Sequence, residues 1–290
     1  MHETEKRAGA ATPIIIVSSI QRFPMPENEI EKILSDAQHF LRQEQLLFGN
    51  SFYRETIVPK TPLTAIADNK EEPMAAKKKT DTPAVNEPII VTGRTDGPKK
   101  PWQSAGDLTD LNKQICDCLN CGLGKTRTKF VFGVGNPNAD LLVIGEAPGA
   151  DEDAKGEPFV GRAGQLLNKI LEAVQFKREE VFIANILKCR PPENRRPNPA
   201  EVEQCEPYLW KQIELIKPKF ILCLGLTAAQ TLLKTDESLT NLRASIHMYH
   251  GVPTFVTYHP AALLRNPNWK RPTWEDVQKL RKMYDESKSN

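Results

Sequence analysis

The sequence predicts an α/β domain, a three-layer α/β/α sandwich around a central, mainly parallel four-stranded sheet. Two observations favour this fold class. Several apolar segments of strand length run without polar interruption, as strands do when helices cover both faces of a sheet. Amphipathic segments of helical length alternate with them, and these supply the crossover connections that parallel strands require.

The chain divides into three parts. Residues 1–60 form an N-terminal extension, in which residues 27–49 carry apolar side chains mostly at helical spacing and end at a glycine. We expect one amphipathic helix there, which either packs on the main domain or binds a protein partner. Residues 61–104 are rich in Pro, Ala, Lys and Thr without an apolar period, which predicts a disordered linker. Residues 105–290 form the folded domain.

In the folded domain, strands are predicted at 139–145, 181–187, 219–225 and 254–260, and helices at 161–174, 198–217 and 226–234. The second helix has a clear start, with Asn198 as N-cap, Pro199 at the first position and Glu201 completing a capping box. In parallel sheets, ligands bind beyond the carboxyl ends of the strands. The residues that follow each strand are therefore the candidate functional residues.

Charge and hydropathy narrow the class of protein. The formal net charge is only +2, so attraction to nucleic acid must rest on local basic patches. No apolar run reaches the roughly eighteen residues of a membrane span. The apolar run at residues 13–17 is too short for a signal peptide. We therefore expect a cytoplasmic protein, associated with the nucleoid.

Polar or aromatic side chains stand at three strand ends. Glu146 follows the first strand and opens a Gly- and Pro-rich loop that also holds Phe159; this loop is acidic and lacks a phosphate-binding glycine motif. Asn185 lies at the end of the second strand and could read a planar, amide-like edge. His259 lies at the carboxyl end of the last strand and could act as a donor or acid. Structural roles stay open, with Glu146 as a backbone cap, Phe159 as a core residue and Asn185 as a strand-end residue.

The segment "AALLR" (261–265) combines apolar side chains with a cation, a composition that could enter a duplex and hold its backbone. A loop that covers the core would look similar.

The six cysteines divide into two groups. Cys118 and Cys121 have the CxxC spacing of two ligands of one metal centre, and Cys189 and Cys205 supply two more thiols. Four thiolates hold either a tetrahedral zinc ion or a 4Fe-4S cluster, and disulfides are disfavoured in a reducing cytosol. Of the remaining two, Cys223 lies inside an apolar strand and is predicted to be a buried small side chain. Cys116 is predicted to be a free thiol.

The sequence resembles the family 4 uracil-DNA glycosylases, the iron-sulfur branch of the uracil-DNA glycosylase superfamily. The resemblance covers about residues 111–285 and rests on "GEAPG", "EPFVGRAGQLL", "NILKCRPPENR", the four-cysteine pattern and "HPAALLRNP", in that order. It implies an enzyme that flips deoxyuridine out of single- or double-stranded DNA and hydrolyses its glycosidic bond. The product would be an abasic site, which begins base-excision repair.

The resemblance also implies roles for individual residues. Phe159 would stack on the flipped uracil, and Asn185 would read its Watson–Crick edge. Glu146 and His259 would form the catalytic pair, with Glu152 helping to position the pocket or the attacking water. Ala147 lies in the pocket where family 1 enzymes have a water-activating aspartate.

The remaining implied residues contact DNA or the cofactor. The cofactor would be a 4Fe-4S cluster, with zinc as the alternative, and its ligands would be Cys118, Cys121, Cys189 and Cys205. The DNA contacts would come from Arg190, Asn194, Arg195, Arg196, Leu263, Leu264 and Arg265. We expect Lys188 to belong to the same basic patch.

No lysine stands where a Schiff-base nucleophile would be expected, so we predict a monofunctional hydrolase that does not cleave the strand. We also expect the protein to be a monomer. Two alternatives stay open. One is a glycosylase of the same fold with an altered base scope, and the other is a catalytically weak iron-sulfur module that only binds DNA.

Overall fold

The computed structural model describes residues 38, 87–92 and 100–289. The helix predicted over residues 27–49 therefore lies outside the described residues, apart from Gln38, which is helical. In the part of the chain that is described, no helix is long and apolar enough to cross a bilayer.

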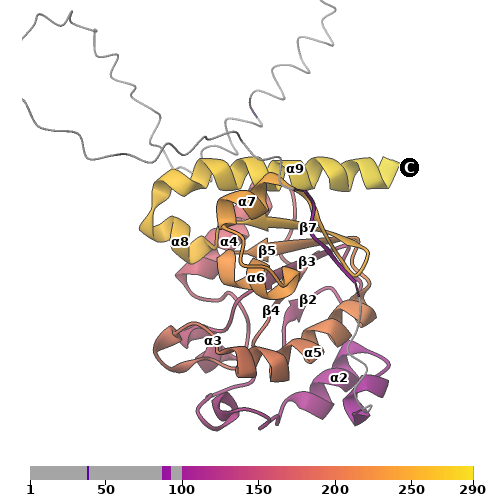
Figure 1. The fold of residues 1–290 in the computed structure, drawn as a ribbon, viewed down its shortest axis with the longest axis vertical. Helices are drawn as coiled ribbons and strands as arrows, with labels where there is room; N and C mark the ends of the chain where they lie inside the picture. Colours follow the sequence, from indigo (N-terminus) through magenta and orange to yellow (C-terminus); the bar gives the residue numbers. More distant parts are fainter. Residues whose placement is uncertain (1–37, 39–86, 93–99, 290) are drawn as a thin grey trace, which may run out of the picture. The chain divides into compact units, whose positions relative to one another are not determined.

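A seven-stranded sheet in the order β1-β6-β7-β5-β3-β4-β2 forms the centre of the fold (Figure 1). The four inner strands run parallel to one another and are β3 (Leu141–Gly145), β4 (Phe182–Asn185), β5 (Phe220–Leu224) and β7 (Val252–Thr257). These are the four predicted strands, and the predicted fold class is confirmed. Three short strands widen the sheet and are β1 (Ile90–Val91), β2 (Val134–Gly135) and β6 (His247–Tyr249). They were not predicted, since two or three residues are too few to show a period.

Helices cover both faces of this sheet. The helices are α2 (Leu108–Ile115), α3 (Ala150–Lys155), α4 (Arg162–Ala173), α5 (Pro199–Ile216), α6 (Leu226–Leu233), α7 (Leu239–Ala244), α8 (Pro260–Arg265) and α9 (Lys270–Ser289). Short 3-10 helices are η1 (Pro101–Ser104), η2 (Gly122–Lys125), η3 (Pro192–Asn194) and η4 (Pro267–Trp269). The start of α5 is as predicted, because a carboxylate oxygen of Glu201 accepts the backbone N–H of Asn198 at 2.9 Å.

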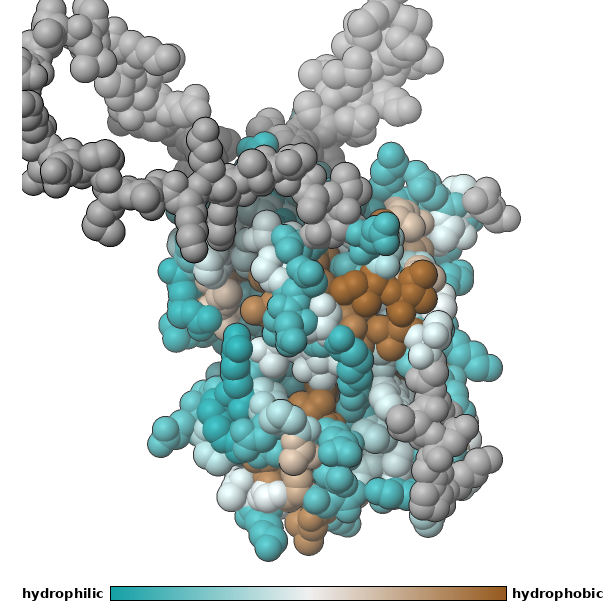
Figure 2. Space-filling model, in the orientation of Figure 1, coloured by the Kyte–Doolittle hydropathy of each residue, from teal (hydrophilic) through white to brown (hydrophobic). Residues whose placement is uncertain are grey.

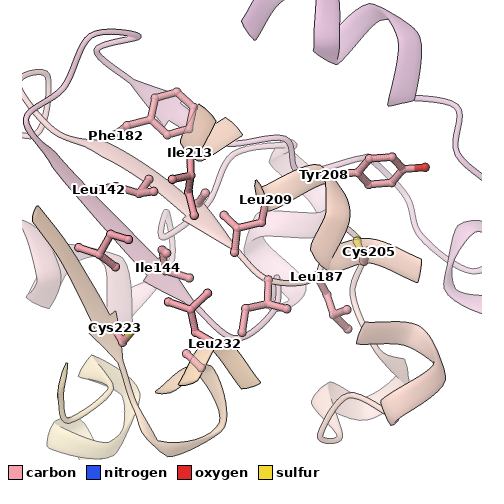
Figure 3. Packing of buried hydrophobic residues seen from close by; sticks show 14 of the residues in the cluster. Leu142, Ile144, Phe182, Leu187, Cys205, Tyr208, Leu209, Ile213, Cys223 and Leu232 are labelled. Atoms are coloured by element: carbon pink, nitrogen blue, oxygen red, sulfur yellow. The ribbon is translucent and has the colours of Figure 1, made fainter. Parts of the chain in front are cut away.

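Alternate residues of the strands divide the core into two layers. Leu142 and Ile144 of β3 point toward α5, where Figure 3 shows them beside Leu209 and Ile213. Their neighbours Leu141 and Val143 belong to the opposite layer, which α4 and α9 cover. This alternation is the period of two that a strand imposes, so each inner strand must be apolar on both faces.

Part of the segment predicted as a disordered linker is ordered. Ile90 and Val91 form β1, which pairs in parallel with β6. Trp102 in η1 is buried and meets the ring of Tyr208 edge-on, with the centroids 4.9 Å apart. The linker prediction is therefore wrong for residues 87–92 and 100–104, where pairing with the domain outweighs the local composition. Ile90 stays 66% exposed, and the face shown in Figure 2 carries a cluster of brown atoms on the side where β1 lies in Figure 1.

Candidate active site

The carboxyl ends of β3, β4 and β7 meet at one edge of the sheet. Gly145, the last residue of β3, lies directly beside Asn185, the last residue of β4. A cavity of about 380 Å³ opens beyond this edge. It is lined by Glu146, Ala147, Pro148, Gly149, Glu152, Phe159, Ala163, Asn185, Pro191, Asn194, Arg195, His259, Ala261 and Arg265. The predicted substrate-binding and catalytic residues thus lie together, although their loops are far apart in the sequence.

Phe159 is held in the cavity wall by two glycines. Its side chain is buried, and its backbone adopts a left-handed conformation with φ of 53°. A Cβ atom on Gly145 would stand 2.7 Å from the Phe159 ring and would also collide with the amide of Asn185. A Cβ atom on Gly164 would collide with the carbonyl group of Phe159. Both positions therefore require glycine, and the packing leaves the ring little freedom to move.

Asn185 carries a buried polar atom without a partner. Its residue is 2% exposed, and within the described part of the protein its Oδ1 atom accepts no hydrogen bond. A buried polar group left unpaired costs about 1–3 kcal/mol. Because the amide borders the cavity, a ligand with a donor beside an acceptor would satisfy it.

His259 is fixed as a neutral donor. It is the N-cap of α8, and its Nδ1 atom accepts the backbone N–H of Ala261 at 3.1 Å. The ring proton therefore sits on Nε2. Burial lowers the pKa of His259 to about 4; Arg265 also lowers it, whereas Glu152 acts in the opposite direction. The imidazole is uncharged at neutral pH, and its ring lies 5.5 Å from that of Phe159, centroid to centroid.

The two carboxylates of the cavity differ in their surroundings. Glu152 accepts three backbone N–H groups, from Gly149 at 3.1 Å, Val160 at 3.0 Å and Gly161 at 3.1 Å. It therefore holds the two ends of the loop that carries Phe159. Glu146 lines the cavity, and its backbone carbonyl group accepts the N–H of Leu187 at 3.1 Å.

The stretch from Lys188 to Cys205 exposes fewer cationic side chains than the sequence suggested. Lys188 is fully buried, where its Nζ atom donates to the carbonyl oxygen of Asn185 at 2.7 Å and to Oε1 of Gln212 at 2.6 Å. Its assignment to a DNA-facing patch is therefore wrong. Arg195 is exposed at the cavity rim and forms a two-pronged ion pair with Glu201 at 2.6 and 2.9 Å.

The other residues of this stretch stay near the surface. Arg190 is half-buried, and its Nε atom donates to Oδ1 of Asn194 at 2.8 Å. Arg196 is exposed, and its carbonyl oxygen accepts Nη1 of Arg195 at 3.0 Å. Asn194 and Arg195 line the cavity, and Arg190 and Arg196 lie close to them in the chain.

The two leucines of α8 face in different directions. Leu263 is 1% exposed and packs in the core with α4 and α9, whereas Leu264 is 48% exposed. Successive helical residues point about 100° apart, so the two cannot share one face. The prediction that Leu263 contacts DNA is therefore wrong, and Leu264 and Arg265 remain as the exposed end of the helix.

Four cysteines come from three separate parts of the chain. Cys118 and Cys121 lie after α2, Cys189 follows β4, and Cys205 lies in α5. Burial raises the pKa of Cys205 to about 12; nearby Lys188 opposes this shift, and the neighbouring thiols of Cys189 and Cys118 add to it. The thiols are thus close enough to influence one another.

Hydrogen-bond donors surround these sulfurs. Tyr208 donates to Sγ of Cys118 at 3.2 Å, Arg127 to Sγ of Cys189 at 3.3 Å, and the backbone N–H of Lys188 to Sγ of Cys205 at 3.2 Å. Arg127 also donates to the carbonyl oxygens of Cys116 and Cys118. Neither Arg127 nor Tyr208 was predicted, because nothing in the local sequence marks them.

The donor set fits a 4Fe-4S cluster. In the residues that the structure describes, no three His, Cys, Asp or Glu side chains are arranged around one metal ion. A cluster does not need that arrangement, because its four cysteines bind four different iron atoms and stand farther apart than the ligands of one ion. Hydrogen bonds to the sulfurs are also typical of such clusters.

A family model described as the uracil DNA glycosylase superfamily matches residues 132–279, about half of the chain. The match spans β3, β4, β5 and β7 and the cavity at their carboxyl ends. The chain belongs to this superfamily.

Relatives place it more closely within the superfamily. The chain is 42% identical over 181 residues to a type-4 uracil-DNA glycosylase of Archaeoglobus fulgidus, covering 60% of this chain and 91% of the relative. It is 39% identical over 175 residues to a type-4 uracil-DNA glycosylase of Thermotoga maritima, covering 59% of this chain and 91% of the relative. Identity to a type-5 uracil-DNA glycosylase of Pyrobaculum aerophilum is 30% over 163 residues, or 50% of this chain and 71% of the relative. Within the superfamily the chain is therefore a type-4 member, as the resemblance predicted.

Proposed function

We propose that this protein is a uracil-DNA glycosylase that hydrolyses the N-glycosidic bond of deoxyuridine in DNA, releases uracil and leaves an abasic site for base-excision repair. One observation carries the proposal: the buried Oδ1 atom of Asn185, which accepts no hydrogen bond from the described residues, belongs to a side chain that borders the same cavity as the Phe159 ring and the neutral His259. The names of the type-4 relatives support the same substrate.

Recognition begins when the nucleotide leaves the base stack, because its glycosidic bond is not reachable inside a duplex. The flipped base then lies on the Phe159 ring. Uracil presents an N3–H donor beside an O4 acceptor, and the amide of Asn185 can pair with both. Cytosine presents the reverse pattern at these positions. Cytosine would therefore leave the buried amide of Asn185 unpaired, and the lost hydrogen bonds make its binding free energy less favourable than that of uracil.

Bond cleavage transfers charge to the uracil, and His259 would stabilise that charge. The Nε2–H group of a neutral imidazole donates to the O2 atom as that oxygen becomes negative. The backbone N–H of Ala261 holds the ring in this tautomer. Ala147 cannot activate water, so the reaction depends on stabilising the departing anion. Glu146 is the cavity carboxylate that is free to face the cationic sugar or orient the water.

The cavity also supports a monofunctional reaction. A strand-cleaving glycosylase needs an amine to form a Schiff base, and the described cavity lining includes no lysine. Lys188 lies three residues after the cavity residue Asn185. Its amine already donates to the carbonyl oxygen of Asn185 and to Oε1 of Gln212.

We further propose that Arg190, Asn194, Arg195 and Arg196 bind phosphates on one side of the flipped nucleotide. Leu264 and Arg265 would contact the strand from the other side of the cavity. The protein would act as a monomer on single- and double-stranded DNA in the cytoplasm.

A 4Fe-4S cluster held by Cys118, Cys121, Cys189 and Cys205 would serve a structural purpose, since hydrolysis transfers no electron. It would fix the first turns of α5 and the loop that follows β4, and that loop borders the cavity. Cys116 and Cys223 would take no part.

The test is release of uracil from single-stranded, U·G and U·A oligonucleotides, followed by alkali cleavage of the abasic product. Strand breaks that appear only after alkali support the monofunctional reading. If none of the three oligonucleotides shows strand breaks, the proposed glycosylase activity is contradicted. The alternative of a module that only binds DNA would then remain. Comparable release of other deaminated bases would indicate an altered base scope.

A further inference from the structure

Two exposed hydrophobic side chains stand on the segment that follows His259. In the described residues, four large hydrophobic side chains are exposed, namely Ile90, Leu119, Leu264 and Trp269. Two of these four lie within six residues of each other, on α8 and η4, directly after His259. Arg265, on the same segment, lines the cavity. An exposed tryptophan four residues after a cavity residue is a candidate contact for a ligand that extends out of the cavity.

Trp269 is stacked on one of its faces and is partly exposed. Its ring lies nearly parallel to that of Tyr258, with an interplanar angle of 10° and centroids 5.0 Å apart. Tyr258 directly precedes His259, so the stack begins one residue from the cavity. Trp269 is nevertheless 37% exposed. Because Tyr258 covers one face, only the other face of the indole is left for a further ring to stack on.

The stack is anchored before any ligand arrives. The guanidinium group of Arg243 lies 4.6 Å from the centroid of Tyr258 and is itself held by Asp276 at 2.6 and 3.0 Å. The backbone N–H of Trp269 donates to the carbonyl oxygen of Asn266, and its own carbonyl oxygen accepts the hydroxyl of Thr273 at 2.8 Å. A rigid aromatic surface loses little entropy when it binds, which favours this position for recognition.

The surrounding charge favours nucleic acid. Residues 259–274 contain Arg265, Lys270 and Arg271 but no acidic residue. Arg271 pairs weakly with Glu275 of the following turn, at 3.5 Å between exposed groups. An aromatic face among cations is the usual composition of sites that bind single-stranded nucleic acid, where bases stack and phosphates meet positive charge.

We propose that the open face of Trp269 stacks on an unpaired base of single-stranded DNA that flanks the flipped nucleotide. The assignment to a flanking base rests on the proposed function, because it places the flipped nucleotide in the cavity beside Tyr258. In a duplex the flanking base stays paired to the opposite strand and stacked on its outer neighbour, so it cannot leave the helix to cover Trp269. The platform therefore favours uracil in single strands.

The experiment compares wild-type protein with Trp269→Ala, with Trp269→Phe, which keeps an aromatic face, and with Ile90→Ala, which removes an exposed side chain elsewhere. Steady-state uracil release gives KM and kcat on single-stranded and duplex oligonucleotides of the same sequence. Fluorescence anisotropy gives the Kd for a uracil-free single strand, which needs no turnover.

For Trp269→Ala we expect about tenfold higher KM on the single strand and about tenfold higher Kd for the uracil-free strand. We expect less than about a twofold change in KM on the duplex, and unchanged kcat on both substrates. Trp269→Phe should recover most of the loss, and Ile90→Ala should match the wild type.

Equal KM increases on single-stranded and duplex DNA, or an unchanged Kd for the uracil-free strand, would overturn the proposal. So would a fall in kcat alone, which would mean that Trp269 acts only by supporting Tyr258 and His259. The two proposals can fail separately: Trp269-dependent binding without uracil release contradicts only the glycosylase, whereas release that ignores Trp269 contradicts only the platform.

Discussion

The Nδ1 atom of His259 accepts the backbone N–H of Ala261 at 3.1 Å. This hydrogen bond leaves the only ring proton on Nε2 and fixes the ring at the start of α8. Together with burial, which lowers the pKa of His259 to about 4, it makes the residue a neutral donor at the rim of the cavity. The chemistry proposed for the site depends on this tautomer.

Replacing His259 should therefore slow the chemical step. We expect His259→Ala to lower kcat for uracil release by about 10²–10³-fold, the usual effect of losing one donor to a developing anion. His259→Gln keeps an N–H donor and should retain more activity than the alanine variant. Single-turnover rates on a single-stranded substrate measure this. Equal rates for the wild type and His259→Ala would remove His259 from the mechanism.

The lowered pKa also predicts how stability depends on pH. The unfolded chain binds a proton at His259 below about pH 6.5, whereas the folded protein does so only near pH 4. The unfolded state thus holds more protons between these values, and the residue costs stability as the pH falls through this window. We expect the wild type to lose more thermal stability than His259→Gln between pH 7 and pH 4.5. If the Tm of the two proteins changed equally with pH, the lowered pKa of His259 would be contradicted.

Gly164 should be intolerant of any side chain. A Cβ atom there would collide with the backbone of Phe159, so Gly164→Ala must move the ring or strain the loop, at a cost of about 1–3 kcal/mol in unfolding free energy. Gly106→Ala is the matched control, because nothing lies within 4 Å of a Cβ atom at that position. Denaturant unfolding and uracil KM test both variants. Tolerance of alanine at Gly164 would mean that the Phe159 wall is not rigid.

The two neighbouring arginines of the 188–205 stretch should behave differently. Arg196→Ala should weaken binding to all DNA sequences and lower the salt slope of log K by about 0.7–0.9, the value for one phosphate contact. Arg195→Ala should also lower the melting temperature, because Arg195 pairs with Glu201 at the start of α5. Anisotropy titrations across a salt series measure the slope. An unchanged slope in the Arg196 variant would exclude that phosphate contact.

Metal analysis and absorbance test the cysteine assignment. We expect the purified protein to be brown, with absorbance near 400 nm, and Cys205→Ser to lose both the colour and several degrees of Tm. Cys116→Ser is the control and should keep the cluster, since Cys116 is not one of the four proposed ligands and its thiol donates to the carbonyl oxygen of Lys113 at 3.6 Å. A colourless protein that contains one zinc ion would contradict the iron-sulfur proposal.

Much of the fold could be predicted because the inner strands are apolar on both faces and the helices between them are amphipathic. The position of the site followed from the same pattern, since Glu146, Asn185 and His259 each stand at a strand end. The fate of single side chains could not be predicted. Lys188 and Leu263 lie in segments whose sequence suggests exposure, but both are buried. Lys188 donates hydrogen bonds to Asn185 and Gln212, and Leu263 packs in the core.

The predicted linker shows a different limit. Ile90 and Val91 are ordered by pairing with β6, which is more than 150 residues away in the chain. Local composition carries no information about such a partner. The same holds for Glu152, whose three backbone partners are set by the path of the loop rather than by spacing alone.

Uracil release by wild type and Asn185→Asp, measured on identical single-stranded oligonucleotides that contain uracil or cytosine, tests the central claim most directly. Asn185 is the buried amide whose unmet hydrogen bond a base edge would complete. The account predicts robust uracil release by the wild type, and in the variant either loss of that activity or new release of cytosine. Unchanged uracil release by Asn185→Asp would contradict it.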